Sequence, residues 1–278
     1  MPLRLTIKPR PIPSTRALEN IALATFTGRW DKGVPLARTH IALTQPLASE
    51  LQPNLRVLWF NVLGENPISV QHLSTRLTEA DPDIIVLGEA ARFREAPEIL
   101  TRNYPHKLGC DTHCELLIHS RYPLRGTLLA DLGPLFHERL AKADVLLSPG
   151  LSVTLSVAHM SKPWYVGMTA REDHRLHHHI RQHTGPHILI GDFNSAPWSH
   201  RIKRRTQWND LRGLRVPVST WPVPLGRFGL PIDQVFVGGG VQVTAIAPWG
   251  RDLGSNHLGL LVDLHLPDIA AQYAVLVA

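Results

Sequence analysis

The sequence predicts an α/β fold in which strands outnumber helices. Two apolar runs near the start of the main domain, RVLWFNVL at 56–63 and DIIVLGEA at 83–90, flank a segment with helical spacing of apolar residues at 68–80. Runs this short and this apolar are typical of strands buried on both faces. The three segments together indicate a βαβ-like unit, and from residue 116 onward strand-like segments dominate.

Length and composition favour one large domain. The chain has 278 residues, of which 44% are hydrophobic, so it can bury a substantial core. Its net charge of +6 and its pI near 9.7 favour partners that are polyanionic or bear phosphate. No apolar run approaches the roughly 20 residues that span a bilayer, and the first residues lack the apolar core of a signal peptide. We expect a soluble monomer.

Residues 1–53 are predicted to form an irregular N-terminal arm, and residues 54–278 the main domain. The arm contains seven prolines and one short helix-compatible piece at 15–26. It either wraps over the domain or is partly disordered.

The elements that follow the βαβ-like unit are mainly strands. One helix is predicted at 92–102 and another, rich in histidine, at 169–183. The histidines either bind a metal or line a solvated face. A basic segment at 200–205 is either a solvated face or a contact for phosphate. A proline-rich loop is expected at 217–231, and the predicted strands are 116–120, 127–130, 144–147, 151–159, 188–190, 232–240, 241–247 and 258–266.

The motif ILIGDFNSAPWS at 188–199 joins an apolar strand to a turn that carries Asp192 and Asn194. Residues i and i+2 of a strand share one face, and Gly191 permits close approach of a ligand. The carboxylate and the amide are therefore expected to hold a water, a metal ion or a phosphoryl oxygen. The alternative is an Asx turn, in which these side chains bond their own backbone.

Polar side chains also stand at the boundaries of the other apolar strands. A carboxylate such as Glu89 is costly to bury at a strand end unless it is paired or binds metal, although it can instead reach solvent past the sheet edge. His159 is either part of the same site or a packed core residue. The end of one strand and the start of its antiparallel neighbour share an edge, so all these side chains can converge. They are Asn61, Glu89, His159, Asp192 and Asn194 at strand ends, and Asp233, Asn256 and His257 at strand starts.

This order of residues resembles the endonuclease/exonuclease/phosphatase superfamily, whose fold is shared by DNase I, abasic-site endonucleases, sphingomyelinases and inositol polyphosphate 5-phosphatases. The resemblance spans about residues 55–266 and rests on GDFN, PID and SNH at their spacing. The stretches HMSKPWY, GDFNSAPWS and TWP are similar to a bacterial branch. The resemblance implies a four-layer α/β/β/α sandwich of two mostly antiparallel sheets, with 54–278 as the catalytic domain.

The resemblance also implies Mg²⁺ or Mn²⁺ as the cofactor. Glu89 matches the family's metal ligand, and Asn61 matches the amide beside it. Asn256 departs from the pattern, because the family usually has Asp before the last histidine. An amide oxygen still coordinates, but the lost charge weakens binding of a hard cation or alters its stoichiometry.

The catalytic roles follow in the same way. Asp192 and Asn194 match the pair that orients the attacking water and holds a phosphate oxygen. Asp233 and His257 match the carboxylate–imidazole pair thought to act as general base. His159 matches the second histidine of the DNase I and sphingomyelinase branches, which assists at the phosphate or the leaving group. In-line attack at phosphorus needs such a base, a cation and donors to the non-bridging oxygens.

The implied function is metal-dependent hydrolysis of phosphodiester or phosphomonoester bonds, with nucleic acid the leading substrate on grounds of charge. One alternative is a lipid or sugar-phosphate phosphoesterase with peripheral membrane contact through its Trp-rich loops. Another is a catalytically inert module that binds phosphorylated ligands. Specificity in such folds resides in loops, which the sequence does not rank.

Cys110 and Cys114 are four residues apart, and the chain has no other cysteine. They either form a small-loop disulfide, bind a metal with His113, or stay reduced. A second pair of zinc ligands is not evident nearby. A disulfide is expected, and with it an oxidising, extracytoplasmic location, periplasmic or secreted.

Overall fold

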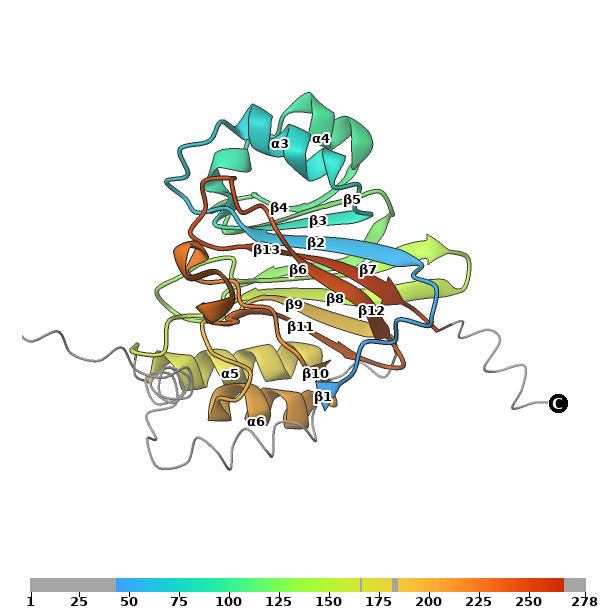
Figure 1. The fold of residues 1–278 in the computed structure, drawn as a ribbon, viewed down its shortest axis with the longest axis vertical. Helices are drawn as coiled ribbons and strands as arrows, with labels where there is room; N and C mark the ends of the chain where they lie inside the picture. The colour runs from blue at the N-terminus through green and yellow to red at the C-terminus, as the bar shows by residue number, and fades with distance from the viewer. Residues whose placement is uncertain (1–43, 166, 182–184, 268–278) are drawn as a thin grey trace, which may run out of the picture.

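The computed structural model describes residues 44–165, 167–181 and 185–267. Within them, two β-sheets stack face to face and a pair of helices covers the outer face of each sheet (Figure 1). The α/β/β/α sandwich is therefore confirmed. No helix in these ranges is long and apolar enough to cross a bilayer. The helix-compatible piece predicted at 15–26 lies outside the described residues.

The first sheet has six strands in the order β12-β13-β2-β3-β5-β4. Neighbours are antiparallel except β2 and β3, because a helix returns the chain between these two. The bounds are β2 Leu55–Asn61, β3 Ile84–Gly88, β4 His106–Gly109, β5 Leu116–Ser120, β12 Gln242–Trp249 and β13 Gly259–His265.

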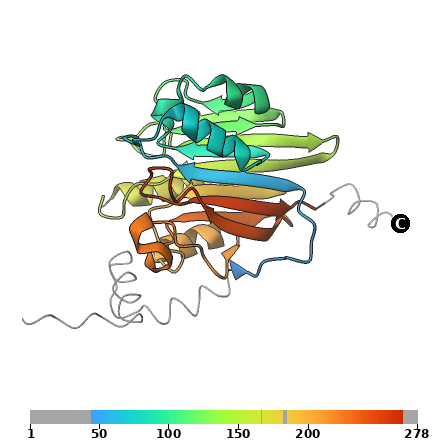
Figure 2. The ribbon, with the colours of Figure 1, turned by 45° about the horizontal axis from the view of Figure 1, so that its top comes forward.

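The second sheet has five strands in the order β11-β9-β8-β7-β6, and only β8 and β9 are parallel. Turning the molecule brings the first sheet and its helices forward (Figure 2). The bounds are β6 Leu124–Ala130, β7 Leu140–Ser148, β8 Leu151–His159, β9 His187–Asp192 and β11 Asp233–Gly238.

The apolar runs are continuous because each central strand is buried on both faces. Val57 and Trp59 of β2 belong to the core between the sheets, whereas Leu58 and Phe60 belong to the core under the helices of the first sheet. Such a strand has no polar face, as the sequence indicated.

Helices α3 (Val70–Glu79) and α4 (Glu98–Asn103) cover the first sheet, and α5 (Met168–Ile180) and α6 (His200–Asn209) cover the second. Serine caps start two of them. The Ser69 hydroxyl accepts the His72 N–H, and the Ser199 hydroxyl accepts the Ile202 N–H, each at 3.2 Å. Ser199 therefore turns the chain into α6 directly after the GDFN motif.

The single helix predicted at 92–102 is wrong. The chain forms a 3₁₀ turn, η1 (Ala90–Phe93), and then α4, which begins after Pro97. Proline removes an N–H donor and disfavours helical geometry in the residue before it, so the helix is interrupted there. A 3₁₀ segment, η2 (Val223–Phe228), also lies within the proline-rich loop.

The described part of the predicted arm, residues 44–53, packs on the domain. Strand β1 (Thr44–Gln45) pairs in parallel with β10 (Gly213–Leu214), and the Ala48 N–H donates to the Val243 carbonyl at 2.9 Å. This end of the segment therefore belongs to the folded domain.

Two arginines of the basic segment at 200–205 join α6 to α5 instead of facing a substrate. Arg201 lies 3.1 Å from the Asp173 carboxylate and 3.2 Å from Glu172, and Arg205, which is buried, pairs with the same Asp173. Buried charges need such partners. For Arg201 and Arg205, a phosphate-contact role is not supported by this geometry.

Gly191 of β9 lies close against the backbone of β8. A Cβ at this residue, where φ is +152°, would lie 1.9 Å from the Ala158 carbonyl oxygen. Gly191→Ala must push the strands apart, so we expect the free energy of unfolding to fall by about 3 kcal/mol or more, measured by urea denaturation.

Gly150→Ala is the matched control. Gly150 also has a positive φ, +83°, but nothing lies within 4 Å of its Cβ position. Only the backbone cost of about 1–2 kcal/mol is expected there. Equal losses in the two variants would show that β9 does not need this close approach.

Candidate active site

The ends and starts of several strands meet at one edge of the sandwich. In the second sheet, Asp192 at the end of β9 stands opposite His159 at the end of β8 and Asp233 at the start of β11. In the first sheet, Asn61 ends β2 beside β3, after which Glu89 follows. The predicted convergence of these residues is therefore present.

The Asp192 carboxylate lies at the centre of the group. Its Oδ2 atom is 3.5 Å from Asn61 Nδ2, 3.6 Å from His159 Nε2 and 3.9 Å from His257 Nε2. These distances exceed those of ordinary hydrogen bonds, so Oδ2 has room to accept a further donor or a cation. Its Oδ1 atom accepts the Asn194 N–H at 2.8 Å.

The GDFN motif contains an Asx turn. Asn194 lies beyond the end of β9 with φ +45°, so the expectation that Asp192 and Asn194 share one strand face is wrong. The Asn194 N–H bonds to Asp192, and the Asn194 amide donates to the Met160 carbonyl at 2.8 Å. The turn fixes the Asp192 carboxylate in place, so it is compatible with a functional role for Asp192.

His257 and Asp233 form a buried pair that joins the two sheets. His257 precedes β13 of the first sheet, and its Nδ1 lies 2.8 Å from Oδ2 of Asp233 in the second sheet. The indole N–H of Trp59 donates to the other oxygen of Asp233 at 2.8 Å. Both carboxylate oxygens are thus held, and the carboxylate fixes the ring with Nε2 toward Asp192.

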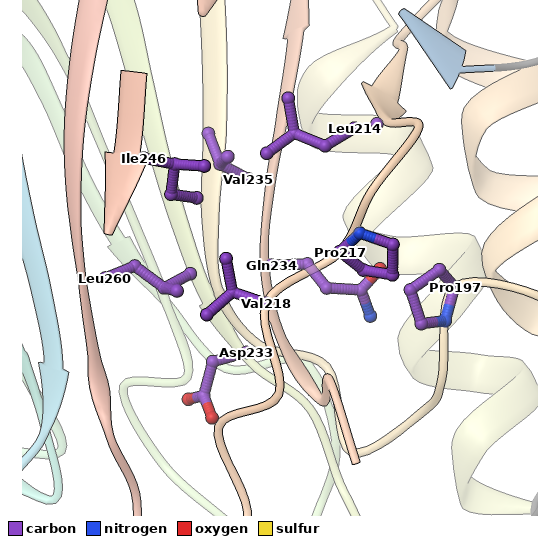
Figure 3. A pocket seen from close by; sticks show the side chains of 10 residues that line it. Pro197, Leu214, Pro217, Val218, Asp233, Gln234, Val235, Ile246 and Leu260 are labelled. Carbon is purple, nitrogen blue, oxygen red and sulfur yellow. The ribbon is translucent and has the colours of Figure 1, made fainter. Parts of the chain in front are cut away.

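A small cavity of about 20 Å³ beside Asp233 is lined mainly by apolar side chains. Figure 3 shows Asp233 at one end of it, with Val218, Val235, Ile246 and Leu260 among the other residues. Low polarity strengthens attraction between buried charges. The Asp233 carboxylate, which contacts His257, therefore borders a mainly apolar cavity.

The electrostatics of the site follow from this burial. Burial opposes a charge on His257, but the carboxylates of Asp233, Asp192 and Glu89 outweigh it and raise its pKa to about 9. Burial, reinforced by the charge of Asp233, raises the pKa of Asp192, and the two imidazoles act against this. The edge therefore concentrates negative charge that protons or cations balance.

His159 has a carboxylate partner that the sequence analysis missed. Its Nδ1 lies 2.6 Å from Oε1 of Glu115, and Arg139 Nη2 is 3.3 Å from the same oxygen. Burial acts to raise the pKa of Glu115, yet His159 and Arg139 hold it below its usual value. Glu115 directly precedes β5, so a search for polar residues at strand starts would have found it.

The Glu89 carboxylate is held by two donors. Asn61 Nδ2 is 3.1 Å from its Oε1, and the Gly64 N–H is 3.0 Å from its Oε2. The Asn61 oxygen accepts the Leu63 N–H at 3.1 Å, so Asn61 orients Glu89 through its amide N–H in this structure. Asn256 is exposed, and its backbone carbonyl accepts the Val223 N–H.

The donor set fits a hard divalent cation. Carboxylate oxygens are the ligands that Mg²⁺ and Mn²⁺ prefer, and the edge supplies those of Glu89 and Asp192. Within the described ranges, one group of His, Cys, Asp or Glu side chains lies close enough together to share a cation. It consists of Asp192, Asp233 and His257. The described histidines of α5 are absent from such a group, and His177 Nδ1 instead lies 2.8 Å from the Asn209 oxygen. Cys110 and Cys114 form a disulfide, as expected.

An open cleft extends from the edge to one side. It has a volume of about 460 Å³, and three of the candidate site residues, Glu89, His159 and Asn194, line it. The other lining residues are mostly polar, basic or aromatic: Gly64, Ala91, His113, Cys114, Glu115, Phe136, Arg139, Ser161, Lys162 and Tyr165.

The chain matches a protein-family model, two bacterial proteins and solved structures. The model of the Endonuclease/Exonuclease/phosphatase family matches residues 58–257. A UPF0294 protein of Vibrio vulnificus is 33% identical over 129 residues, which are 45% of this chain and 44% of that protein, so the match spans less than half of its length. A UPF0294 protein of Photorhabdus laumondii is 24% identical over 242 residues, 76% of this chain and 88% of that protein.

A solved structure described as an endonuclease/exonuclease/phosphatase from Beutenbergia cavernae has the same fold. Its TM-score is 0.60 at 20% identity, over 77% of this chain and 72% of that one. The family match includes all eight side chains predicted to converge at the edge, since it runs from residue 58 to residue 257.

Proposed function

The chain belongs to the Endonuclease/Exonuclease/phosphatase family, and from this premise we propose that it is a phosphodiesterase that depends on Mg²⁺ or Mn²⁺. One observation carries the proposal: the Asp192 carboxylate lies between two imidazoles, and each imidazole is held by its own carboxylate. Two oriented imidazoles near the Asp192 carboxylate suit a reaction in which one group removes a proton from the nucleophile and another gives a proton to the leaving group.

In the proposed mechanism, His257 Nε2 removes the proton of the attacking water, and Asp233 balances the imidazolium that forms. His159, held by Glu115, gives a proton to the leaving oxygen. Asp192 orients the water, and Asn194 lies where it can hold a phosphate oxygen. A divalent cation held by Glu89, with Asn61 orienting that carboxylate, would supply positive charge to the phosphate oxygens.

Nucleic acid is the leading substrate class. The net charge of +6 attracts polyanions, and the cleft beside His159 carries Lys162 together with the rings of Phe136 and Tyr165. Cations and aromatic rings are the groups that track a phosphate backbone and stack on bases.

Phospholipid is the second candidate, and a specific observation favours it. Near the cleft, Leu135 and Trp164 are 61% and 64% exposed, and on the η2 segment Phe228 is 58% exposed. Exposed apolar side chains beside lysine and arginine suit a membrane surface. The Cys110–Cys114 disulfide supports an extracytoplasmic location, periplasmic or secreted, because oxidising compartments preserve such bonds.

A substrate panel tests the proposal. We expect hydrolysis of bis(4-nitrophenyl) phosphate and of DNA or RNA with Mg²⁺ or Mn²⁺, lost on chelation with EDTA, and slower turnover of 4-nitrophenyl phosphate. Faster hydrolysis of sphingomyelin in vesicles than of nucleic acid would select the lipid candidate. Binding of these substrates without metal-dependent hydrolysis of any of them would identify an inert phospholigand-binding module.

A further inference from the structure

Glu138 is a buried carboxylate that the proposed mechanism does not use. It is 7% exposed, and its two oxygens accept three consecutive backbone N–H groups. Oε1 accepts those of Thr112 at 3.0 Å and His113 at 2.9 Å, and Oε2 accepts that of Cys114 at 2.7 Å. One side chain thus holds the backbone N–H groups of residues 112–114, directly before Glu115.

Arg139, the next residue, holds the other parts of the same unit. Its Nη2 lies 3.3 Å from Oε1 of Glu115, and its backbone carbonyl accepts the His159 N–H at 3.0 Å. The guanidinium also lies over the Phe136 ring, 4.3 Å from the centroid. Two adjacent residues therefore contact the loop before Glu115, the Glu115 carboxylate and the backbone of His159.

The loop itself has little freedom. The Cys110–Cys114 disulfide closes it, and Cys114 is covalently followed by Glu115. The Cys114 sulfur is 3.1 Å from the Ala90 carbonyl oxygen, and the Ala90 N–H donates to the Glu115 carbonyl at 3.3 Å. Any shift of this loop therefore displaces Glu115 relative to His159.

The backbone at Glu138 indicates that its position is imposed. Its φ is +53°, in the left-handed region that costs a residue with a Cβ roughly 1–2 kcal/mol. Its own N–H donates to Asp131 Oδ1 at 2.8 Å, which helps to fix this conformation. The three N–H donors hold the pKa of Glu138 below its usual value despite its burial, so the acceptor is a charged carboxylate. Such outliers persist only where the surroundings determine them.

We propose that Glu138 and Arg139 are positioning residues for proton transfer at the leaving group, because together they hold Glu115 against His159. The proposal rests on the proposed function, since it concerns the same site. Glu138 acts through the backbone of residues 112–114, and Arg139 acts through the Glu115 carboxylate.

The leaving group distinguishes this role from general structural support. A diester that releases 4-nitrophenol needs little protonation of the leaving oxygen, whereas one that releases an alcohol such as methanol needs a proton donor. In Glu138→Gln, an amide N–H₂ replaces one acceptor and faces backbone donors. We expect kcat for the methyl ester to fall about 10- to 100-fold and kcat for the 4-nitrophenyl ester to change less than about threefold. KM should stay unchanged for both esters.

The matched control is Glu79→Gln, an exposed carboxylate on α3 that pairs with Arg76. It should leave both substrates unaffected. Arg139→Lys is the second variant, because it keeps the charge but lacks the Nη2 atom that lies 3.3 Å from Glu115, and it should show the same dependence on the leaving group. An equal loss on both esters in these variants, or no loss on either, would overturn the proposal.

Hydrogen exchange gives a readout that does not depend on activity. In the wild-type protein the amides of Thr112, His113 and Cys114 should exchange slowly, and in Glu138→Gln they should exchange at least about tenfold faster while the amides of β5 stay protected. Unchanged exchange at the three amides would refute the role of Glu138. If the wild type hydrolyses no phosphate ester, the proposed function fails, and the exchange result still stands separately.

Discussion

His257→Ala is expected to lower kcat by roughly 10²- to 10⁴-fold and to leave KM nearly unchanged, because it removes the positioned proton acceptor. His257 is 6% exposed, and its Nδ1 lies 2.8 Å from the Asp233 carboxylate, with Nε2 directed to Asp192. The measurement is steady-state kinetics on any accepted diester.

Asp233→Asn should also reduce kcat, because the imidazole would lose its orientation and the charge that stabilises its protonated form. His72→Ala is the control, since this histidine is exposed on α3. His159→Ala should cost about as much as His257→Ala, because His159 protonates the leaving group in the proposed mechanism; a smaller loss would mean that His159 only holds a phosphate oxygen. If His257→Ala keeps more than about a tenth of the wild-type rate, the base is another group.

The pH dependence of the same reaction follows from the pKa of His257. A general base must be neutral, so with a pKa of about 9 the rate should rise with pH and level off near that value. Positive charge bound at Glu89 or Asp192 should move this limb to lower pH, because those carboxylates help to raise the pKa.

Folding stability depends on pH in the opposite direction from the rate. The folded-state pKa of His257 lies above the value of about 6.5 for an unfolded chain. The contribution of its charge is therefore complete below about pH 6.5 and is lost as the pH rises from there through about 9.

The pH–rate profile of His257→Ala should lack the limb near pH 9.

Glu89→Ala is expected to reduce kcat/KM by about 10³-fold or more, because the charge of a bound cation is worth several kcal/mol in such a transition state. Calorimetric titration with Mg²⁺ and Mn²⁺ should show weakened binding in parallel. Glu79→Ala, which removes an exposed carboxylate, is the control.

This variant also separates an enzyme from a binding module. If the protein only binds phosphorylated ligands, Glu89→Ala should leave ligand affinity almost unchanged and there should be no turnover to lose. Undiminished metal-dependent turnover in Glu89→Ala would mean that the cation binds elsewhere, with Asp192, Asp233 and His257 as the next candidates.

Much of the fold was predictable from sequence because its central strands are buried on both faces. The runs at 56–63, 83–90 and 188–190 correspond to β2, β3 and β9. Short strands such as β4 and β10 were not predicted, because their pairing depends on tertiary neighbours and not on any local pattern. The break before α4 is predictable from the sequence, because Pro97 disfavours helical geometry in the residue before it.

The candidate site was predictable where polar residues interrupt apolar strands, as at Asn61 and Asp192. The positions at which these side chains sit were apparent, but their mutual contacts were not. Asn194 lies outside the strand in a left-handed conformation, and Glu115 directly follows a loop closed by a disulfide instead of interrupting an apolar run. Which donor bonds which carboxylate depends on the distance between two sheets, and sequence spacing does not report that distance.

Each of the two imidazole–carboxylate pairs crosses from one sheet to the other. His257 and Glu115 adjoin strands β13 and β5 of the first sheet, whereas Asp233 and His159 belong to the second. The apolar side chains between the sheets therefore act as a spacer that sets both histidine–carboxylate distances at once. On the proposed function, removing two methyl-sized groups from that layer, as in Val157→Ala or Val86→Ala, is expected to change the rate. If the proposed function holds, the packing of this layer serves the geometry of the two histidines as well as the stability of the fold.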